Sequence, residues 1–413
     1  MKIVKLSKEQ FDTFAESHRY RNYYQSSMYA RVMSKFGYKT QFLGIINNDN
    51  QLMGATLILY REVFMTSKIA YAPRGILFNY ENEENVKELA AKLKKVLGKQ
   101  GIMLLRIDPY IPLTIRESKG NIINFNNKGN TIIENLKKAG FTYKGKNQFF
   151  ETEKPRWEAL VILQRDIREI YAQLDKRTRT KIKKAMNSGV QIVKDNSNNV
   201  NYLYTFVGKK DKKPLSFYKH MCTQFGNHIE IYYAKLSTDI FLITCRRNYE
   251  KELEYNDILS QKIQDPLIDE QTKNSYLNKK MESDKLVTIY KNNLLSSTES
   301  LKKNPNGVII AAAMVIKYDK AAYIFTEGLN EKYGFINANY LLKWQLIDEF
   351  NKLGYKYINL NAIVGEFEQK NPYSGLNEAK LGFDSTITEY IGEFDIVLNN
   401  FSYNLYCKMN KKK

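Results

Sequence analysis

The densest run of charge in the chain lies between Leu174 and Ala185, where the sequence reads LDKRTRTKIKKA. Its cations, which we predict to bind phosphate groups, are Lys176, Arg177, Arg179, Lys181, Lys183 and Lys184. On a helix such a run projects cations around much of the circumference. There they can neutralise several phosphates at once, an attraction that falls steeply with salt. The alternative interpretation is a solvated helix end that binds nothing.

The usual signatures of catalysis by a metal or a covalent nucleophile are missing. His18, His220 and His228 are the only histidines, and their spacing is not that of metal ligands. The sequence also lacks a serine nucleophile elbow, a Walker loop and a Rossmann glycine pattern. We therefore predict no metal site.

The elements that must position a site are clearest in the last third of the chain. They are the strands Val308–Lys317 and Ala321–Thr326, the helix Ala338–Leu353 and the strand Tyr355–Leu360. Gly354 is expected to end the helix. Strand, strand, helix, strand is the order of the acyltransferase core called the GNAT fold.

The N-terminal half repeats this order. Its predicted elements are the strands Gln41–Asn47 and Gly54–Phe64, the helix Glu84–Leu97 and the strand Ile102–Asp108. After the last strand each half reaches a Lys-x-Gly-Phe sequence, at Lys138–Phe141 and Lys380–Phe383. We therefore predict an internal duplication, giving an α+β protein with two GNAT-like domains in tandem.

The loop before the second core helix bears on cofactor use. A GNAT enzyme that uses acetyl-CoA holds the pyrophosphate with backbone N–H groups that open this helix, in the pattern Gln/Arg-x-x-Gly-x-Gly/Ala. Here Gly328–Ala338 reads GLNEKYGFINA, which lacks that pattern. We predict the fold without the coenzyme, and no other cofactor.

Two long helices are predicted over residues 239–303, with a break at Asp265-Pro266. Each carries one apolar stripe with charges elsewhere, which predicts an antiparallel helical hairpin, of the coiled-coil kind, that projects from the second domain. Such an arm is a platform for a large partner such as RNA. A structural or dimerisation hairpin is the alternative, and the sequence does not indicate the oligomeric state.

The overall charge favours an anionic partner. The 413 residues include 64 Lys and Arg against 44 Asp and Glu, a formal net charge of +20. This charge predicts attraction to nucleic acid, an anionic lipid surface or a phosphorylated substrate. Because the sequence has no apolar stretch of spanning length, no secretory signal and only three scattered cysteines, we expect a cytoplasmic protein, with peripheral contact at the inner membrane face as a further expectation.

Together these features resemble the Fem-type (FemABX) aminoacyltransferases, which build interpeptide bridges in bacterial peptidoglycan. The resemblance covers nearly the whole chain. It includes the two GNAT-like halves, the segment Arg177–Val190, the helical arm, and the end pattern Lys380–Phe383 followed by Tyr390–Phe394. Gln25–Ala30 (QSSMYA) is similar to the family's early Gln-Ser-x-x-Trp segment.

The resemblance implies transfer of an amino acid from aminoacyl-tRNA to the stem-peptide amine of a peptidoglycan precursor, either lipid II or UDP-MurNAc-pentapeptide. The predicted cations would then serve tRNA phosphates and the precursor's diphosphate. Aminolysis of an activated ester needs positioning and donors for the developing oxyanion, and it needs no covalent nucleophile. The alternatives are another GNAT-type N-acyltransferase, including acetyl-CoA users, and a non-catalytic RNA-binding protein.

The resemblance also assigns site residues. The lysine of the family's Phe-Lys-x-Gly-Phe motif falls on Lys380, where it is expected to stabilise charge at the reacting ester from a strand edge, although Ala379 replaces the aromatic residue. The family's early phosphate-binding lysine falls near Met33, so Arg31 or Lys35 is expected to substitute.

Further substrate contacts are expected from two residues of the second half. Tyr323 would form part of the cleft wall, and Asn361 would contact substrate beside Asn359 and Ala362, where the family often has Asp and Gly. In the N-terminal segment, Arg19-Tyr20-Arg21, Arg31 and Lys35 give a basic and aromatic character. Most groups of this kind are solvated surface residues, and contact with a ligand phosphate is the alternative interpretation.

The predicted boundary between the two domains lies near Lys154-Pro155. The first domain would comprise residues 1–153, joined by a C-terminal helix over 397–413. The second would comprise 154–396, with the arm at 239–303 within it.

Overall fold

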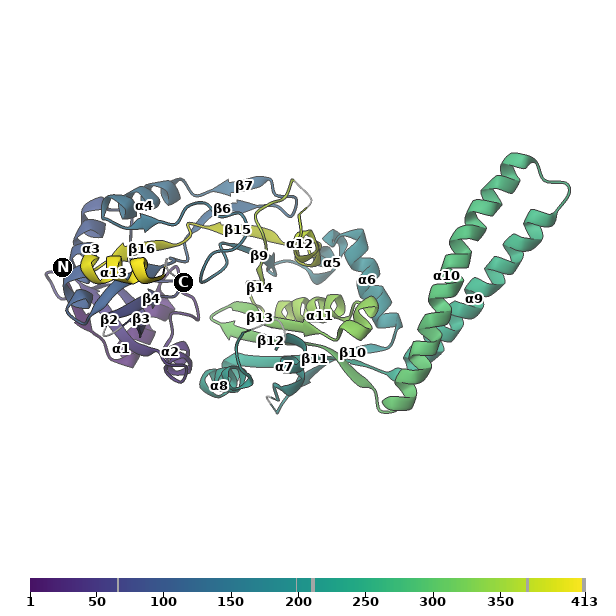
Figure 1. Ribbon diagram of the computed structural model, residues 1–413, viewed down its shortest axis with the longest axis horizontal. Coiled ribbons are helices and arrows are strands. Elements are labelled where there is room, and N and C mark those ends of the chain that lie inside the picture. Colours follow the sequence, from purple (N-terminus) through teal and green to yellow (C-terminus); the bar gives the residue numbers. More distant parts are fainter. Residues whose placement is uncertain (65–66, 198, 209–211, 369–370, 411–413) are drawn as a thin grey trace.

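The computed structural model describes residues 1–413 except 65–66, 198, 209–211, 369–370 and 411–413. The protein is of the mixed α+β class, as predicted, with two β-sheets side by side and a pair of long helices projecting from the second (Figure 1). The last three residues of the predicted C-terminal helix lie outside the described residues. Among the described residues, no helix is both long enough and apolar enough to cross a bilayer.

The first sheet has seven strands in the described part of the chain. In spatial order they are β1 (Lys2–Lys5), β2 (Lys39–Ile46), β3 (Leu52–Phe64), β4 (Ser67–Ala72), β5 (Ile102–Ile107), β16 (Phe394–Val397) and β8 (Thr142–Tyr143). The helices of this half are α1 (Lys8–Ser17), α2 (Ser27–Ser34), α3 (Glu83–Gly98) and α4 (Asn127–Lys138), and α13 (Asn400–Asn410) lies against β5.

The second sheet has nine strands among the described residues. Their order is β10 (Val190–Asp195), β11 (Ile229–Leu236), β12 (Val308–Tyr318), β13 (Ala321–Leu329), β14 (Tyr357–Ala362), β9 (Trp157–Ile162), β15 (Thr386–Tyr390), β6 (Pro112–Arg116) and β7 (Ile122–Phe125). Its helices are α5 (Ile167–Gln173), α6 (Lys176–Asn187), α7 (Asn201–Val207), α8 (Leu215–Phe225), α11 (Ala338–Lys352) and α12 (Ser374–Leu381), with short 3₁₀ turns η1 (Gly226–His228) and η2 (Glu331–Ile336).

The local signals in the sequence explain the centre of this sheet. β12 and β13 form the predicted hairpin. α11 connects β13 to β14, which runs parallel to it. Gly354 follows the C-cap Leu353 with φ 72, a conformation that glycine adopts without steric cost, so α11 ends within one residue of the predicted position. α11 buries Leu342, Leu346 and Phe350 against the sheet, which makes this face the core of the second half.

Over their first seven positions the two sheets follow one plan in the described residues. Neighbouring strands run antiparallel in both, except at β4–β5 and β13–β14, which are parallel. In each sheet the strand at the sixth position comes from a part of the chain distant from its neighbours. β9 follows the N-terminal half in the sequence but lies in the second sheet, whereas β16 follows the C-terminal half but lies in the first.

The predicted domain limits divide the sequence into consecutive ranges, whereas each sheet contains strands from both ranges. Within the predicted residues 1–153, β6 and β7 lie at the edge of the second sheet, beside β15. Within the predicted residues 154–396, most of β16 lies in the first sheet. Since each range contributes strands to the other's sheet, neither sheet is complete without both.

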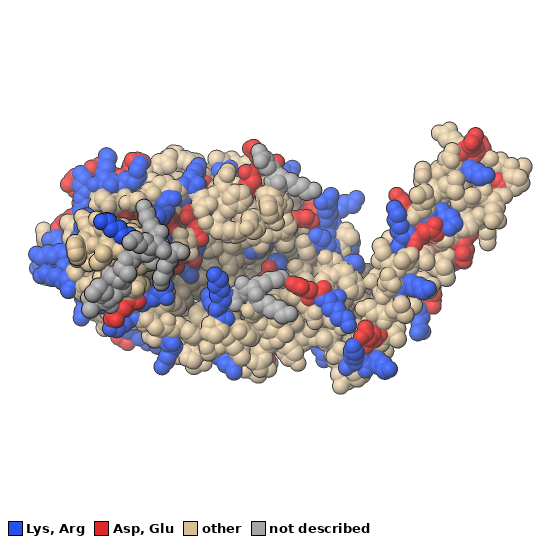
Figure 2. Space-filling view, viewed as in Figure 1, with Lys and Arg blue, Asp and Glu red and all other residues tan. Residues whose placement is uncertain are grey.

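α9 (Thr238–Gln264) and α10 (Glu270–Lys303) pack along each other and project from the body as the helical arm (Figure 1). The contact between them is partly polar. Asn256 is buried and donates to Asp284 at 2.8 Å and to Ser283 at 3.2 Å, while Ser283 donates to Glu252 at 2.7 Å. Basic and acidic side chains both appear along the arm (Figure 2), so it is not a uniformly cationic surface.

Arg156 lies immediately before β9, where the chain enters the second sheet. Its side chain is fully buried. Nη2 donates to the hydroxyl of Tyr143 on β8 at 2.7 Å, and Nη1 donates to Gly145 O at 3.1 Å and to Glu151 at 3.2 Å. Nε donates to Glu389 of β15 at 3.3 Å. One guanidinium therefore connects the edge of the first sheet to the interior of the second.

Replacing Arg156 with Met is expected to lower the free energy of unfolding by about 3–5 kcal/mol, because Glu389 and Glu151 would lose their buried cation. Urea unfolding followed by circular dichroism measures this difference. Arg168→Met, at an exposed position on α5, is the matched control and should change stability by less than about 0.5 kcal/mol. Equal effects of the two substitutions would show that the buried guanidinium does not hold the sheets together.

Candidate active site

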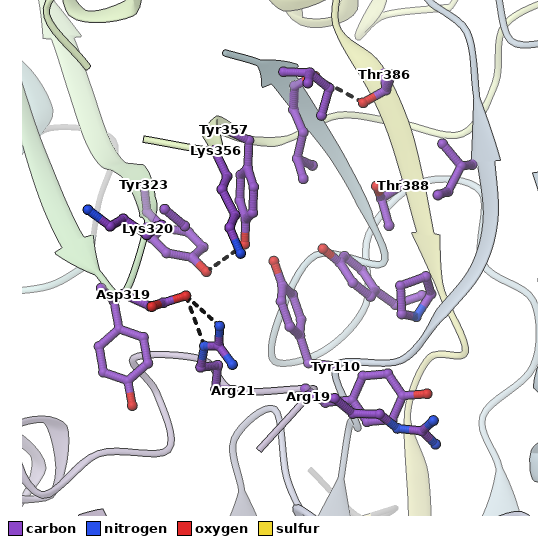
Figure 3. A pocket seen from close by; sticks show the side chains of 18 residues that line it. Arg19, Arg21, Tyr110, Asp319, Lys320, Tyr323, Lys356, Tyr357, Thr386 and Thr388 are labelled. Atoms are coloured by element: carbon purple, nitrogen blue, oxygen red, sulfur yellow. Dashed lines mark hydrogen bonds and ion pairs between the residues drawn. The ribbon is translucent and has the colours of Figure 1, made fainter. Parts of the chain in front are cut away.

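A cavity of about 430 Å³ lies between the two halves. Its walls come from the segment after α1, from β6 and its preceding loop, and from β9, β13, β14 and β15 (Figure 3). Residues from both ends of the chain therefore meet around one hollow. This size suits a small-molecule ligand or one part of a larger one.

Four cations line this cavity against one carboxylate, that of Asp319. Arg21 binds Asp319 through Nε at 3.0 Å and Nη2 at 2.5 Å, a contact that joins the N-terminal half to the β12–β13 turn (Figure 3). Arg19 pairs with Glu81 at 3.0 Å. Lys320 and Lys356 are exposed, and neither forms an ion pair within the described residues. The cavity therefore carries an excess of positive charge that suits an anion.

Tyrosines form much of the remaining wall. The hydroxyls of Tyr323 and Tyr357 lie 3.1 Å apart (Figure 3). The rings of Tyr110 and Tyr390 stack with their centroids 4.4 Å apart, and the Arg74 guanidinium lies 5.1 Å and 4.9 Å from these centroids. Rings with a polar tip can contact both the apolar and the hydroxylated parts of a ligand.

Below these rings lies Glu158 of β9, which is buried. Its Oε1 accepts from Arg74 Nη2 at 2.6 Å. Its Oε2 accepts from Asn359 at 2.6 Å, and from Tyr110 and Tyr390 at 3.2 Å and 3.1 Å. A buried carboxylate is costly unless its hydrogen bonds are complete. This one is surrounded by donors from both halves.

Beside Glu158, the parallel strands β13 and β14 separate. Their pairing runs only from Ala321↔Tyr357 to Tyr323↔Asn359. Beyond it Asn361, with φ 71, donates from its side chain to Ile324 O at 3.3 Å and Phe325 O at 3.1 Å. The side-chain amide thus bridges the strands where the ladder ends. The opening between β13 and β14 beyond this point is named the strand split.

Lys380 points into this region from α12. The prediction that it lies at a strand edge is wrong, because the Lys-x-Gly-Phe sequence ends a helix and Gly382 caps it. Nζ of Lys380 donates to Ala362 O at 2.7 Å, and the residue is only 6% exposed. Burial lowers the pKa of this ammonium to about 8, an effect that Glu327 partly offsets.

Two further charges lie near Lys380. Lys343 of α11, which is buried, pairs with Glu327 of β13 at 2.5 Å. Sequence reasoning did not identify this pair, because lysine and glutamate at these positions resemble ordinary surface residues. The same holds for Arg74 and Glu158. For the cavity itself, the basic and aromatic segment Arg19–Arg21 was a usable signal.

Of the other residues predicted to bind substrate, some border the cavity and others lie outside it. Tyr323 lines the cavity, and it borders a smaller gap together with Asn361. Arg31 and Lys35 lie on or next to α2, outside the lining of the cavity. There Arg31 donates to Gln224 at 2.8 Å, so its side chain connects α2 to α8.

The six predicted phosphate-binding cations all lie on α6, as the sequence suggested. Two of them have internal partners: Arg179 donates to Ala172 O at 2.9 Å, and Lys181 donates to Glu378 at 3.0 Å and to the Tyr340 hydroxyl at 2.9 Å. The exposed ones are Lys176, Arg177, Lys183 and Lys184.

Comparison with known proteins agrees with this architecture. The model of the FemAB family matches residues 6–411. Aminoacyltransferase FemA of Staphylococcus epidermidis is 23% identical over 429 residues and covers 100% of both chains. Aminoacyltransferase FemA of Staphylococcus aureus is 23% identical over 430 residues, covering 100% of this chain and 99% of its own. A crystal structure of FemX superposes with a TM-score of 0.71 at 17% identity, covering 98% and 99% of the two chains, a likeness of fold.

The chain belongs to the FemAB family. The prediction of an enzyme of the aminoacyltransferase class is confirmed by these relatives.

The buried lysine should make stability depend on pH. Between about pH 8 and 10.5 the unfolded chain keeps a proton on Lys380 that the folded chain has lost, so the free energy of unfolding rises with pH in this window. Below about pH 8 Lys380 is protonated in both the folded and the unfolded chain, so the cost of burying its charge does not change with pH. Lys380→Met should therefore be more stable than the parent by roughly 3 kcal/mol at pH 7.5, and this advantage should shrink towards pH 10.5.

Urea unfolding at several pH values measures this difference. Lys176→Met, at an exposed position, is the control, and its difference from the parent should stay constant. A constant difference for Lys380→Met as well would mean that Lys380 keeps its proton in the folded protein.

Proposed function

We propose that the protein transfers an amino acid from aminoacyl-tRNA to the stem-peptide amine of a peptidoglycan precursor, lipid II or its UDP-linked form. The observation that carries this proposal is Lys380, a buried cation at the strand split, beside a cavity rich in cations and tyrosines. The relatives named aminoacyltransferase FemA support the reaction class.

The acceptor is proposed to occupy the cavity between the halves. Both forms of the precursor carry a diphosphate, for which Lys320 and Lys356 are free and Arg19 and Arg21 lie close. The tyrosine-lined walls suit the sugar and the peptide. The stem-peptide amine would extend from there towards the strand split.

The donor is proposed to approach the split from the other end of β13. A second hollow of about 380 Å³ lies there, lined by Thr326–Leu329, by Phe206 and Val207, and by Asn339 at the start of α11. It borders Glu327, which pairs with Lys343. The aminoacyl ester of the tRNA would reach Lys380 through this hollow.

The chemistry requires no covalent intermediate. The acceptor amine attacks the ester carbonyl carbon, a C–N bond forms, and the C–O bond to the ribose breaks. The amine gives up a proton and the ribose oxygen takes one. An ammonium has three N–H donors, and Lys380 uses one on Ala362 O, so two remain to stabilise the developing oxyanion.

The finer description of the fold is also part of this proposal. We infer that the two sheets are copies of one GNAT-like unit, with the last strand of each copy exchanged and the helical arm inserted between β11 and β12 of the second. The equal order and direction of strands support the duplication. In both copies the Lys-x-Gly-Phe sequence begins in the last turn of a helix, α4 or α12.

A panel of charged tRNAs, each tested with lipid II and with the UDP-linked precursor and analysed by mass spectrometry, tests the proposed function. A mass increase of one aminoacyl residue on one acceptor is expected. Absence of any adduct across the panel would contradict the proposal.

Lys380→Met is expected to lower kcat by about 10²–10³-fold, because one preorganised oxyanion donor is removed. Lys352→Met, an exposed position on α11, serves as the control and should retain the parent rate. Thermal unfolding of both variants confirms that they are folded. Full activity of the Lys380 variant would exclude the catalytic assignment.

The double substitution Lys320→Ala with Lys356→Ala is expected to raise the KM for the acceptor about tenfold with little change in kcat, because the diphosphate loses two charge-assisted contacts. Initial rates at varied acceptor concentration measure this. An unchanged acceptor KM would place the diphosphate outside the cavity.

A further inference from the structure

A separate cavity of about 550 Å³ lies at the base of the helical arm, between α6, α9 and α10. We call it the root cavity. Its lining includes Lys183, Lys184, Phe241, Arg247, Tyr290 and Phe335. The cavity is comparable in size with the one between the two halves, and no step of the proposed reaction uses it.

The charge of the root cavity is one-sided. Lys183, Lys184 and Arg247 line it, and its lining has no carboxylate. None of the three forms an ion pair with any described residue. Three like charges around one hollow repel each other, and an anion bound between them would relieve that repulsion. In Figure 2 basic side chains are visible on the part of the body that faces the arm.

The rest of the lining suits a flat ring. Phe335 lies beneath Lys184, whose Nζ is 5.9 Å from the ring centroid, and Phe241 lies 6.2 Å from Phe335. Ile289 is 50% exposed although it borders the cavity, and Tyr290 lies next to it. Uncovered apolar and aromatic surface beside cations is the combination on which an unstacked nucleobase and its phosphate bind.

The position of α6 connects this cavity with the catalytic region. The end of α6 that carries Lys183 and Lys184 borders the root cavity. Towards its other end the helix contacts α12: N-cap Asp175 donates from its backbone N to Gly382 O at 2.9 Å, and Lys181, in the middle of α6, donates to Glu378 at 3.0 Å. α12 holds Lys380. A polyanion that follows α6, about 18 Å long, would therefore lead from the arm to the reacting centre.

We propose that the root cavity binds one unstacked nucleotide of the donor tRNA, with its phosphate against Lys183, Lys184 and Arg247 and its base against Tyr290 and Phe335. This assignment rests on the proposed function for the identity of the RNA. Its role is to fix where the tRNA contacts the body, so that the aminoacyl end reaches the strand split.

The test compares Arg247→Glu with Arg246→Glu, since the two arginines are adjacent and exposed on α9 and only Arg247 lines the cavity. Fluorescence anisotropy with end-labelled tRNA is measured over a range of salt concentrations. We expect about tenfold weaker binding for Arg247→Glu and a salt dependence reduced by about one phosphate contact, with less than a twofold change for Arg246→Glu. Equal losses for both variants would overturn the assignment.

The base contact is tested by Tyr290→Leu, which keeps apolar volume and removes the aromatic ring. We expect tRNA binding to weaken about fivefold or more, while binding of inorganic polyphosphate stays unchanged. Equal effects on both ligands, or none on tRNA, would overturn the base contact. Binding to phosphatidylglycerol vesicles that depends on Arg247, with tRNA binding unaffected, would overturn the choice of RNA.

Kinetics separate this inference from the proposed function. With an active charged tRNA, Arg247→Glu should raise the KM for the donor and leave kcat unchanged, and an unchanged donor KM would overturn the cavity assignment. If no charged tRNA supports transfer, the proposed function fails. A selective loss of tRNA binding by Arg247→Glu would still support the cavity.

Discussion

The arrangement of the whole molecule depends on one buried carboxylate, that of Glu158. It accepts hydrogen bonds from Arg74, which follows β4 of the first sheet, and from Asn359 on β14 of the second. Tyr110 and Tyr390 complete its shell. A carboxylate in such a setting is tolerated only when its partners are all in place. The two sheets must therefore assemble in one relative position, and the strand split lies beside that contact.

The positions of β9 and β16 impose the same requirement on the backbone. β9 carries Glu158 and lies between β14 and β15, whereas β16 lies between β5 and β8. The cavity draws residues from both halves, so it exists only in the assembled protein. The proposed positions of acceptor and donor, on either side of the split between the interior strands β13 and β14, therefore depend on both halves.

Periodicity in the sequence predicted the local elements well, because the apolar pattern of β12, β13 and α11 reflects burial against a neighbouring layer. It could not predict which sheet β9 or β16 would join, since pairing partners distant in sequence leave no periodic signal. The buried charges were hidden for a different reason. Glu158, Lys343 and the burial of Lys380 depend on partners that only the fold brings together, and their residue types are normally exposed. Arg31 was assigned by position alone, and it instead donates to Gln224, 193 residues further along the chain.

A crystal structure of the protein with the UDP-linked pentapeptide precursor would show whether the acceptor occupies the cavity between the halves. We expect the diphosphate within hydrogen-bonding distance of Lys320 and Lys356, and the stem-peptide amine at the strand split, facing Lys380. A precursor bound away from the cavity between the halves, or an amine directed away from Lys380, would contradict this expectation.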